Sequence, residues 1–224
     1  MNSGWMTEVL AVLRKEARVD VRDLGSLLTV ALFSGVTIFA ISVASFNQQL
    51  KGGIAAGLLW VALLFAAVIG QPRRFLTEED QGTSDLLRLL ARPHAIFWGK
   101  CLMGILEMAV TALAMTLFFF LLTSATLKDP GLYALGLTGS VLALVGATSI
   151  SGALASSARN RSTLAAAVAL PLLVPIIFFG IASLRTSLGE GLPENAWPAA
   201  WGLLGYGIAS IITGPWIFSA VWRR

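Results

Sequence analysis

The fold is decided by residues 53–74, which read GIAAGLLWVALLFAAVIGQPRR. The first 18 of these residues carry no charge, and Pro72, Arg73 and Arg74 follow soon after them. An uncharged apolar stretch of that length predicts a helix that spans a membrane, because crossing the hydrocarbon takes about 20 helical residues. Proline disfavours helical geometry in the residue before it, so we expect this span to end near Gly70.

Including this stretch, the chain contains six long apolar stretches, which are separated by five polar gaps. Most of the basic residues lie at the two ends of the chain and in every second gap. Of the 16 Lys and Arg residues, 13 lie in the amino-terminal segment, the second gap, the fourth gap and the carboxyl end, whereas the other gaps hold only Lys51, Lys128 and Arg185. Positive charge beside membrane spans stays in the cytoplasm. The sequence therefore predicts an all-α, polytopic membrane protein with both termini in the cytoplasm. The six predicted spans are about residues 26–46, 53–70, 96–122, 132–156, 164–184 and 199–222.

The composition excludes several other classes of protein. Hydrophobic residues make up 56% of the chain and charged residues 12%, against about 25% charged residues in ordinary soluble domains. The length of 224 residues suits six spans with short connections, so we expect residues 1–224 to form a single transmembrane domain. The net charge of +4 is explained by the basic membrane edges rather than by nucleic acid binding. The one cysteine, Cys101, excludes an internal disulfide and a cysteine-based metal cluster.

Before the first span, residues 5–23 have the pattern of an amphipathic helix. Apolar residues recur at three- and four-residue spacing, which places them on one helical face, and basic residues share a neighbouring face. We expect this helix to lie in the membrane interface; the alternative is a soluble helix that packs on a partner. Because mixed-charge residues precede the first span, we expect that span to be an uncleaved anchor. The apolar set is Met6, Val9, Leu10, Leu13, Ala17 and Val21, and the basic set is Arg14, Lys15, Arg18 and Arg22.

The second gap, residues 71–95, is the one polar stretch long enough to dock another protein. It contains an apolar pair, an acidic trio, a break at Gly82 and a leucine-rich stretch that ends before Pro93. Thr83 or Ser84 can cap a new short helix after the break. We interpret the segment as a broken helical elbow through which a transporter receives force from a cytoplasmic motor, although its composition also fits a solvated loop. The pair is Phe75 and Leu76, the trio is Glu78, Glu79 and Asp80, and the leucines are Leu86, Leu87, Leu89 and Leu90.

The sequence offers no set of residues for enzymatic or nucleotide chemistry. Its one histidine, His94, lies in the second gap, and Glu107 is the one acidic residue inside a predicted span. An ionisable residue in a span is a functional candidate, so Glu107 has either a transport or gating role or a structural one, by snorkelling to the inner boundary or by pairing with Lys100 or Arg92. The phosphate-binding pattern Gly-x4-Gly-Lys-Ser/Thr is absent, so any ATP is bound by a separate subunit. Residues 185–198 are polar and glycine-rich, and we expect a re-entrant or surface-lying helical piece there.

The second gap and two spans carry a resemblance to a known family. The gap matches at Phe75, Glu78, Glu79, Gly82, Thr83, Asp85, Leu87, Leu89, Leu90, Pro93 and Lys100. The second span matches at Gly57, Trp60 and Val61, and the fifth at Leu170, Pro171, Leu172 and Pro175. By the order and spacing of these residues, the chain resembles the CcmB family, permease subunits of the heme-exporter type ABC transporter of bacterial cytochrome c maturation. It departs from the family pattern at Ser84, Asp85 and Ala91.

The resemblance implies an ABC-2-type permease of the bacterial inner membrane, driven by a cytoplasmic ABC ATPase (CcmA). It also implies a complex with a heme-handling membrane protein (CcmC) and a small single-span subunit (CcmD), and indirect contact with a periplasmic heme chaperone. The chain would be non-catalytic and would couple ATP hydrolysis to heme export or to release of the heme-loaded chaperone, with heme as cargo. The alternative is a mechanical scaffold that transmits the motion of the ATPase without conducting a substrate. The implied ATPase-coupling residues are Phe75, Glu78, Glu79, Gly82, Thr83, Asp85, Leu87 and Pro93.

Overall fold

The computed structural model describes residues 4–22, 24–44, 51–123, 125–156, 158 and 160–222, without the side chains of residues 24, 26, 27, 85 and 162. All regular structure in these ranges is helical, so the all-α fold predicted from the sequence is confirmed. The described helices are α1 (Trp5–Arg22), α2 (Leu24–Ala44), α3 (Gly52–Gly70), α4 (Arg73–Asp80), α5 (Ser84–Leu90), α6 (Pro93–Leu122), α7 (Pro130–Ala155), α8 (Arg161–Ser187) and α9 (Pro193–Trp222).

Five apolar stretches of the described chain are long enough to cross a membrane. They lie on α3 with its continuation α4, and on α6, α7, α8 and α9. Each predicted span after the first coincides with one of them. The first predicted span corresponds to α2, whose apolar part Leu28–Ala44 is shorter than the other five but packs beside α3 and α6.

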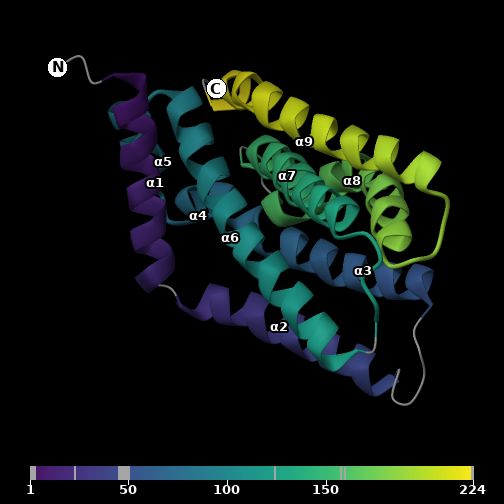
Figure 1. The fold of residues 1–224 in the computed structure, drawn as a ribbon. Coiled ribbons are helices and arrows are strands. Elements are labelled where there is room, and N and C mark those ends of the chain that lie inside the picture. Colours follow the sequence, from purple (N-terminus) through teal and green to yellow (C-terminus); the bar gives the residue numbers. More distant parts are fainter. Residues whose placement is uncertain are drawn as a thin grey trace.

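The bundle is built around α7, which packs against both α8 and α9 (Figure 1). Small residues allow these helices to approach closely, as is usual in membranes. A Cβ atom on Gly207 of α9 would lie 2.7 Å from the backbone nitrogen of Ala143 on α7. Figure 1 shows α6 between this group of helices and the pair α1 and α2.

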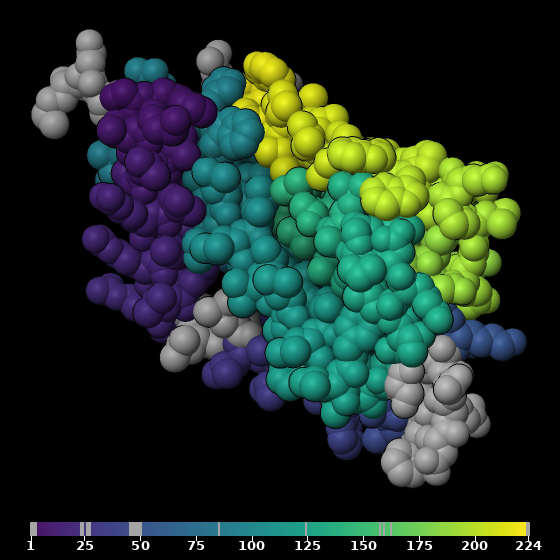
Figure 2. All heavy atoms as spheres, viewed as in Figure 1, coloured from purple at the N-terminus to yellow at the C-terminus, as the bar shows by residue number. Residues whose placement is uncertain are grey.

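The amino-terminal helix α1 packs along α6, so that its surface lies beside that of α6 in Figure 2. Its buried residues are Val9, Val12 and Glu16. Three members of the predicted apolar face, Met6, Leu10 and Val21, are exposed, as a face that meets the membrane interface would be. That α1 lies in the interface stays a prediction. Where α1 meets α6, the missing side chain of Gly99 leaves the space that Val12 occupies.

Helices α4 and α5 form the elbow predicted between the second and third spans. Gly82 lies at the break with φ +67°, a left-handed conformation that glycine adopts without a steric penalty. Thr83 precedes α5 as its N-cap residue, but its hydroxyl lies 3.4 Å from the carbonyl oxygen of Glu78 and caps no α5 N–H. The short second helix is thus present, while the predicted side-chain cap is not.

The segment 185–198 does not form a separate helical piece, so that expectation was wrong. Helix α8 continues through Ser187, and α9 already begins at Pro193, which is well suited to the first turn of a helix. The link between them closes over α3, because the carboxylate of Glu190 accepts a hydrogen bond from the backbone N–H of Gly53. The end of the first predicted span at 45–46, residues 47–50 of the gap after it, Arg159, Arg223 and Arg224 lie outside the described residues.

Candidate functional site

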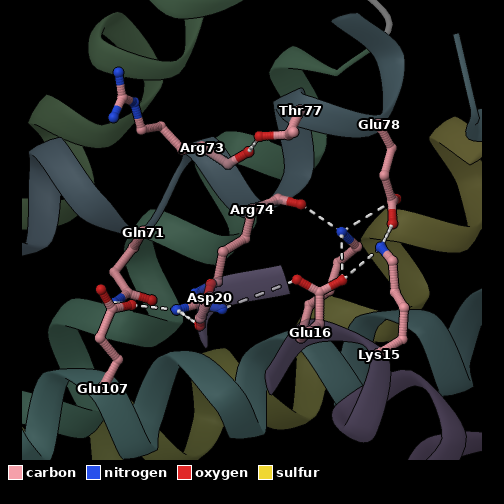
Figure 3. A network of polar contacts seen from close by, with 10 residues as sticks. Lys15, Glu16, Asp20, Gln71, Arg73, Arg74, Thr77, Glu78 and Glu107 are labelled. Carbon is pink, nitrogen blue, oxygen red and sulfur yellow. Dashed lines mark hydrogen bonds and ion pairs between the residues drawn. The ribbon is translucent and has the colours of Figure 1, made fainter. Parts of the chain in front are cut away.

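Seven charged side chains from three helices form a network that we name the charged cluster (Figure 3). Its members are Lys15, Glu16 and Asp20 of α1, Arg74 and Glu78 of α4, and Lys100 and Glu107 of α6. The fold brings them together because α1 packs on α6 and because α4 continues α3 past Pro72 with helical backbone angles.

Arg74 joins all three helices at one end of the charged cluster. Its guanidinium lies 2.8 Å from Asp20 Oδ2 and 3.9 Å from Glu16 Oε2, and it donates a hydrogen bond to Glu107 Oε2. The side-chain amide of Gln71 lies 3.4 Å from the same Glu107 oxygen. A planar guanidinium with five N–H donors suits a position among several carboxylates.

Lys100 joins the same helices at the other end of the charged cluster. Its ammonium lies 3.3 Å from Glu16 Oε1 and 3.1 Å from Glu78 Oε2, and it donates a hydrogen bond to the carbonyl oxygen of Arg74. Lys15 pairs with the same two carboxylates, at 2.9 Å from Glu16. Lys100 is only 1% exposed, so these three oxygens replace the water that its ammonium loses.

Burial makes the pairs of the charged cluster dependent on one another. Glu16, Arg74, Glu78 and Lys100 are all buried. Burial alone would raise the pKa of Glu16, but the three surrounding cations outweigh it and hold that pKa below its usual value. Burial alone would lower the pKa of Lys15, but Glu16 and Glu78 raise it above its usual value. Removing one partner of a buried ion pair costs about 3–5 kcal/mol, so the cluster fixes α1 to α4 and α6.

Two further sets of contacts connect the elbow to α8 and α9. Arg161, the first residue of α8, lies 2.7 Å from Asp80 and 3.8 Å from Glu79. Arg88 of α5 lies 3.3 Å from Glu79, and its guanidinium stands 4.9 Å above the ring of Trp222 at the end of α9. The elbow therefore contacts α1, α6, α8 and α9 through charged side chains.

Phe75 anchors α4 in the same region through aromatic contacts. Its ring centroid lies 5.5 Å from that of Phe97 on α6 and 5.8 Å from that of Phe218 on α9. The ammonium of Lys100 lies 5.6 Å from the centroid of the Phe75 ring. The side of α4 that faces the bundle is thus packed as well as ion-paired.

The outer face of α5 is uncovered. Leu86, Leu89 and Leu90 are exposed, Leu89 by 85%, and we name these three residues the leucine surface. Adjacent exposed apolar side chains mark interaction sites more often than scattered ones do. In Figure 1, α5 lies at the end of the molecule where α6 begins and α9 ends.

The residues predicted to couple to an ATPase divide into two groups in the structure. The buried or half-buried ones are Phe75, Glu78, Glu79, Leu87 and Pro93, and the exposed ones are Gly82 and Thr83. The side chain of Asp85 lies outside the described residues, although its backbone belongs to α5. Only part of the predicted set is therefore placed at the surface.

Glu107 is paired, but with neither of the two predicted partners. It pairs with Arg74, whereas Lys100 pairs with the carboxylates of α1 and α4, and Arg92 lies 3.7 Å from Glu8. Arg74 is distant from Glu107 in the sequence, and it reaches that carboxylate from α4. The sequence did not predict Glu16 as a site residue. It lies four residues after Val12, on the same buried face of α1, and that spacing could have indicated it.

Six apolar helices, with a charged elbow at one end, define a multi-pass α-helical membrane protein. The chain matches the family model described as CcmB protein over residues 7–224. It belongs to that family, and the resemblance predicted from the sequence is confirmed. Heme exporter protein B of Bradyrhizobium diazoefficiens is 24% identical over 225 residues, which cover 98% of this chain and 99% of the relative. Heme exporter protein B of Pseudomonas aeruginosa is 29% identical over 189 residues, which cover 82% and 83%.

Proposed function

We propose that this chain is the membrane permease subunit of an ABC transporter complex for bacterial cytochrome c maturation. It lies in the inner membrane with both termini in the cytoplasm, as the distribution of basic residues indicates. The name of its relatives, heme exporter protein B, supports heme as the cargo. A separate ABC ATPase (CcmA) hydrolyses ATP, and the chain couples that hydrolysis to heme export or to release of the heme-loaded chaperone, together with CcmC and CcmD.

One observation carries the coupling role. The elbow is connected by charged side chains to α1, α6, α8 and α9, while its leucine surface is uncovered. A partner that docks on the leucine surface would therefore move four helices at once. Glu78 acts in this proposal inside the charged cluster and not as a contact with the ATPase.

The proposal is tested by placing a charge on the leucine surface. Leu89→Glu in the native chain should reduce covalently bound heme in c-type cytochromes to the level of a strain that lacks this subunit. Leu192→Glu is the matched control, because Leu192 is also an exposed leucine, at 67%, in the link between α8 and α9. Heme staining and an immunoblot of the membrane fraction report function and protein level. Normal cytochromes in the Leu89→Glu strain would contradict the docking role.

A second function, that of a scaffold without a conduit, is favoured by the packing of the bundle. The backbones of α7 and α9 approach so closely that a Cβ atom on Gly207 would lie within 2.8 Å of α7 backbone atoms. In this alternative the chain passes motion from the ATPase to the heme-handling subunit and moves no substrate. Cells that lack this chain and still deliver heme to the periplasm would favour the scaffold; loss of periplasmic heme would favour the conduit.

A further inference from the structure

An apolar pocket of about 500 Å³ lies between α1, α2 and α6. This volume is within the range of about 300–1,000 Å³ that is usual for small-molecule sites. Most of its lining is aliphatic or aromatic, as at Ile38 of α2 and Phe118 of α6. Two carboxylates of the charged cluster, Asp20 and Glu107, also line it.

The part of the pocket beyond Glu107 has the length of a lipid chain in one leaflet. The lining follows α6 from Met103 to Phe118, and its part from Glu107 to Phe118 is about 16 Å long at a rise of 1.5 Å per residue. One leaflet of the hydrocarbon is about 15 Å thick. The helix faces next to the pocket are apolar and exposed, as at Leu32 of α2 and Leu113 of α6, so the pocket continues the surface that faces lipid.

The charged cluster has one more carboxylate than it has cations, and this excess lies at the end that meets the pocket. It holds four carboxylates and three cations. Lys15 and Lys100 both lie between Glu16 and Glu78, so Arg74 is the one described cation that pairs with Asp20 and Glu107. In Figure 3 the guanidinium of the neighbouring Arg73 points away from them. A negative charge in a region of low dielectric favours an added cation.

We propose that this pocket binds an acyl chain of a phospholipid whose primary ammonium headgroup, as in phosphatidylethanolamine, pairs with Asp20 and Glu107. Arg18 is exposed on α1, three residues before the pocket residue Val21, and so shares its helix face. There it is placed to meet the lipid phosphate. The bound lipid holds α2 beside α1 and α6.

The experiment offers the purified chain an equal mixture of phosphatidylethanolamine and phosphatidylcholine with identical acyl chains. Native mass spectrometry then counts the bound lipids of each kind. We expect the wild-type chain to bind phosphatidylethanolamine about tenfold more than phosphatidylcholine, since a hydrogen bond to a charged group gives at least that factor and a quaternary choline cannot donate one. Asp20→Asn should bring the ratio towards one.

A matched pair of glycine substitutions separates the pocket from the general lipid surface. A Cβ atom on Gly35 of α2, which lines the pocket, or on Gly202 of α9, which does not, would meet no atom within 4 Å. Gly35→Phe should remove most of the retained lipid, whereas Gly202→Phe should leave it unchanged. Equal binding of both lipids by the wild-type chain, or equal retention by both variants, would overturn the proposal. So would efficient cross-linking of Gly35→Cys in native membranes to another polypeptide, because a protein would then fill the pocket.

Discussion

Lys100 and Arg74 are cations inside a largely apolar bundle, and each is surrounded by carboxylates of two other helices. An unpaired charge in such a place would be very costly, because the interior replaces none of the hydration that the ion loses. The pairs therefore make the positions of α1, α4 and α6 depend on one another, and single substitutions in the cluster should have large effects.

We expect Arg74→Met to lower the free energy of unfolding by about 3–5 kcal/mol, because the partly buried carboxylates of Asp20 and Glu107 would lose the buried cation that pairs with both. Arg73→Met is the matched control, since Arg73 is the adjacent residue and is exposed. Its effect should stay within about 0.5 kcal/mol. Chemical unfolding in detergent micelles measures both values, and equal effects of the two substitutions would contradict the role of the cluster.

The lowered pKa of Glu16 predicts that acid weakens the packing of α1 on the bundle and so destabilises the folded protein. A carboxyl whose pKa is lower in the folded than in the unfolded state stabilises the fold above the unfolded value, here 4.5, and this contribution is lost as the pH falls through the folded value. The thermal unfolding midpoint should therefore be constant between pH 7 and 5 and should fall below pH 4.5. Glu16→Gln should lower the midpoint at pH 7 and show a smaller fall in acid. An identical acid profile in the variant would argue against this assignment.

Among the helices, α7 and α9 depend most visibly on small residues. Gly207 and Gly205 lie two positions apart on α9 and face different surroundings. A Cβ atom on Gly207 would meet the α7 backbone at 2.7 Å, whereas one on Gly205 would meet nothing within 4 Å. The approach of the two helices thus requires glycine at one position and tolerates other residues at the second.

We expect Gly207→Ala to destabilise the protein by about 1–3 kcal/mol through overpacking. Gly205→Ala should be neutral or stabilise by up to about 1 kcal/mol, because alanine favours the helix over glycine. Thermal unfolding in one detergent gives the comparison. A larger loss from Gly205→Ala than from Gly207→Ala would contradict the observed contact between α7 and α9.

The location of a helix could be predicted from the sequence where it depends only on residues of the same segment. Long uncharged runs are sufficient to locate the apolar helices, and the glycine break is sufficient to locate the elbow at Gly82. The buried face of α1 could not be predicted, since it depends on the space beside Gly99 of α6. Nor could the partner of Glu107, because Arg74 reaches it only after α4 has packed into the bundle.

For the molecule as a whole, the charged cluster and the leucine surface both belong to the region where the elbow lies. Charge alternation along the chain predicts that this region faces the cytoplasm, and the resemblance to the CcmB family pointed to the elbow as the coupling segment. Only the structure shows which residues of the elbow are buried and which are exposed. Phe75 and Glu78 hold the elbow inside the bundle, whereas Leu86 and Leu89 remain uncovered for a partner.

The most direct test is to purify the tagged chain from its own membranes in mild detergent and to identify the accompanying proteins by mass spectrometry. We predict that an ABC ATPase accompanies the wild-type chain and the Leu192→Glu variant, and that Leu89→Glu loses it while remaining in the membrane. Equal recovery of the ATPase with Leu89→Glu, or its absence from the wild-type preparation, would contradict the assignment of α5 as the docking helix.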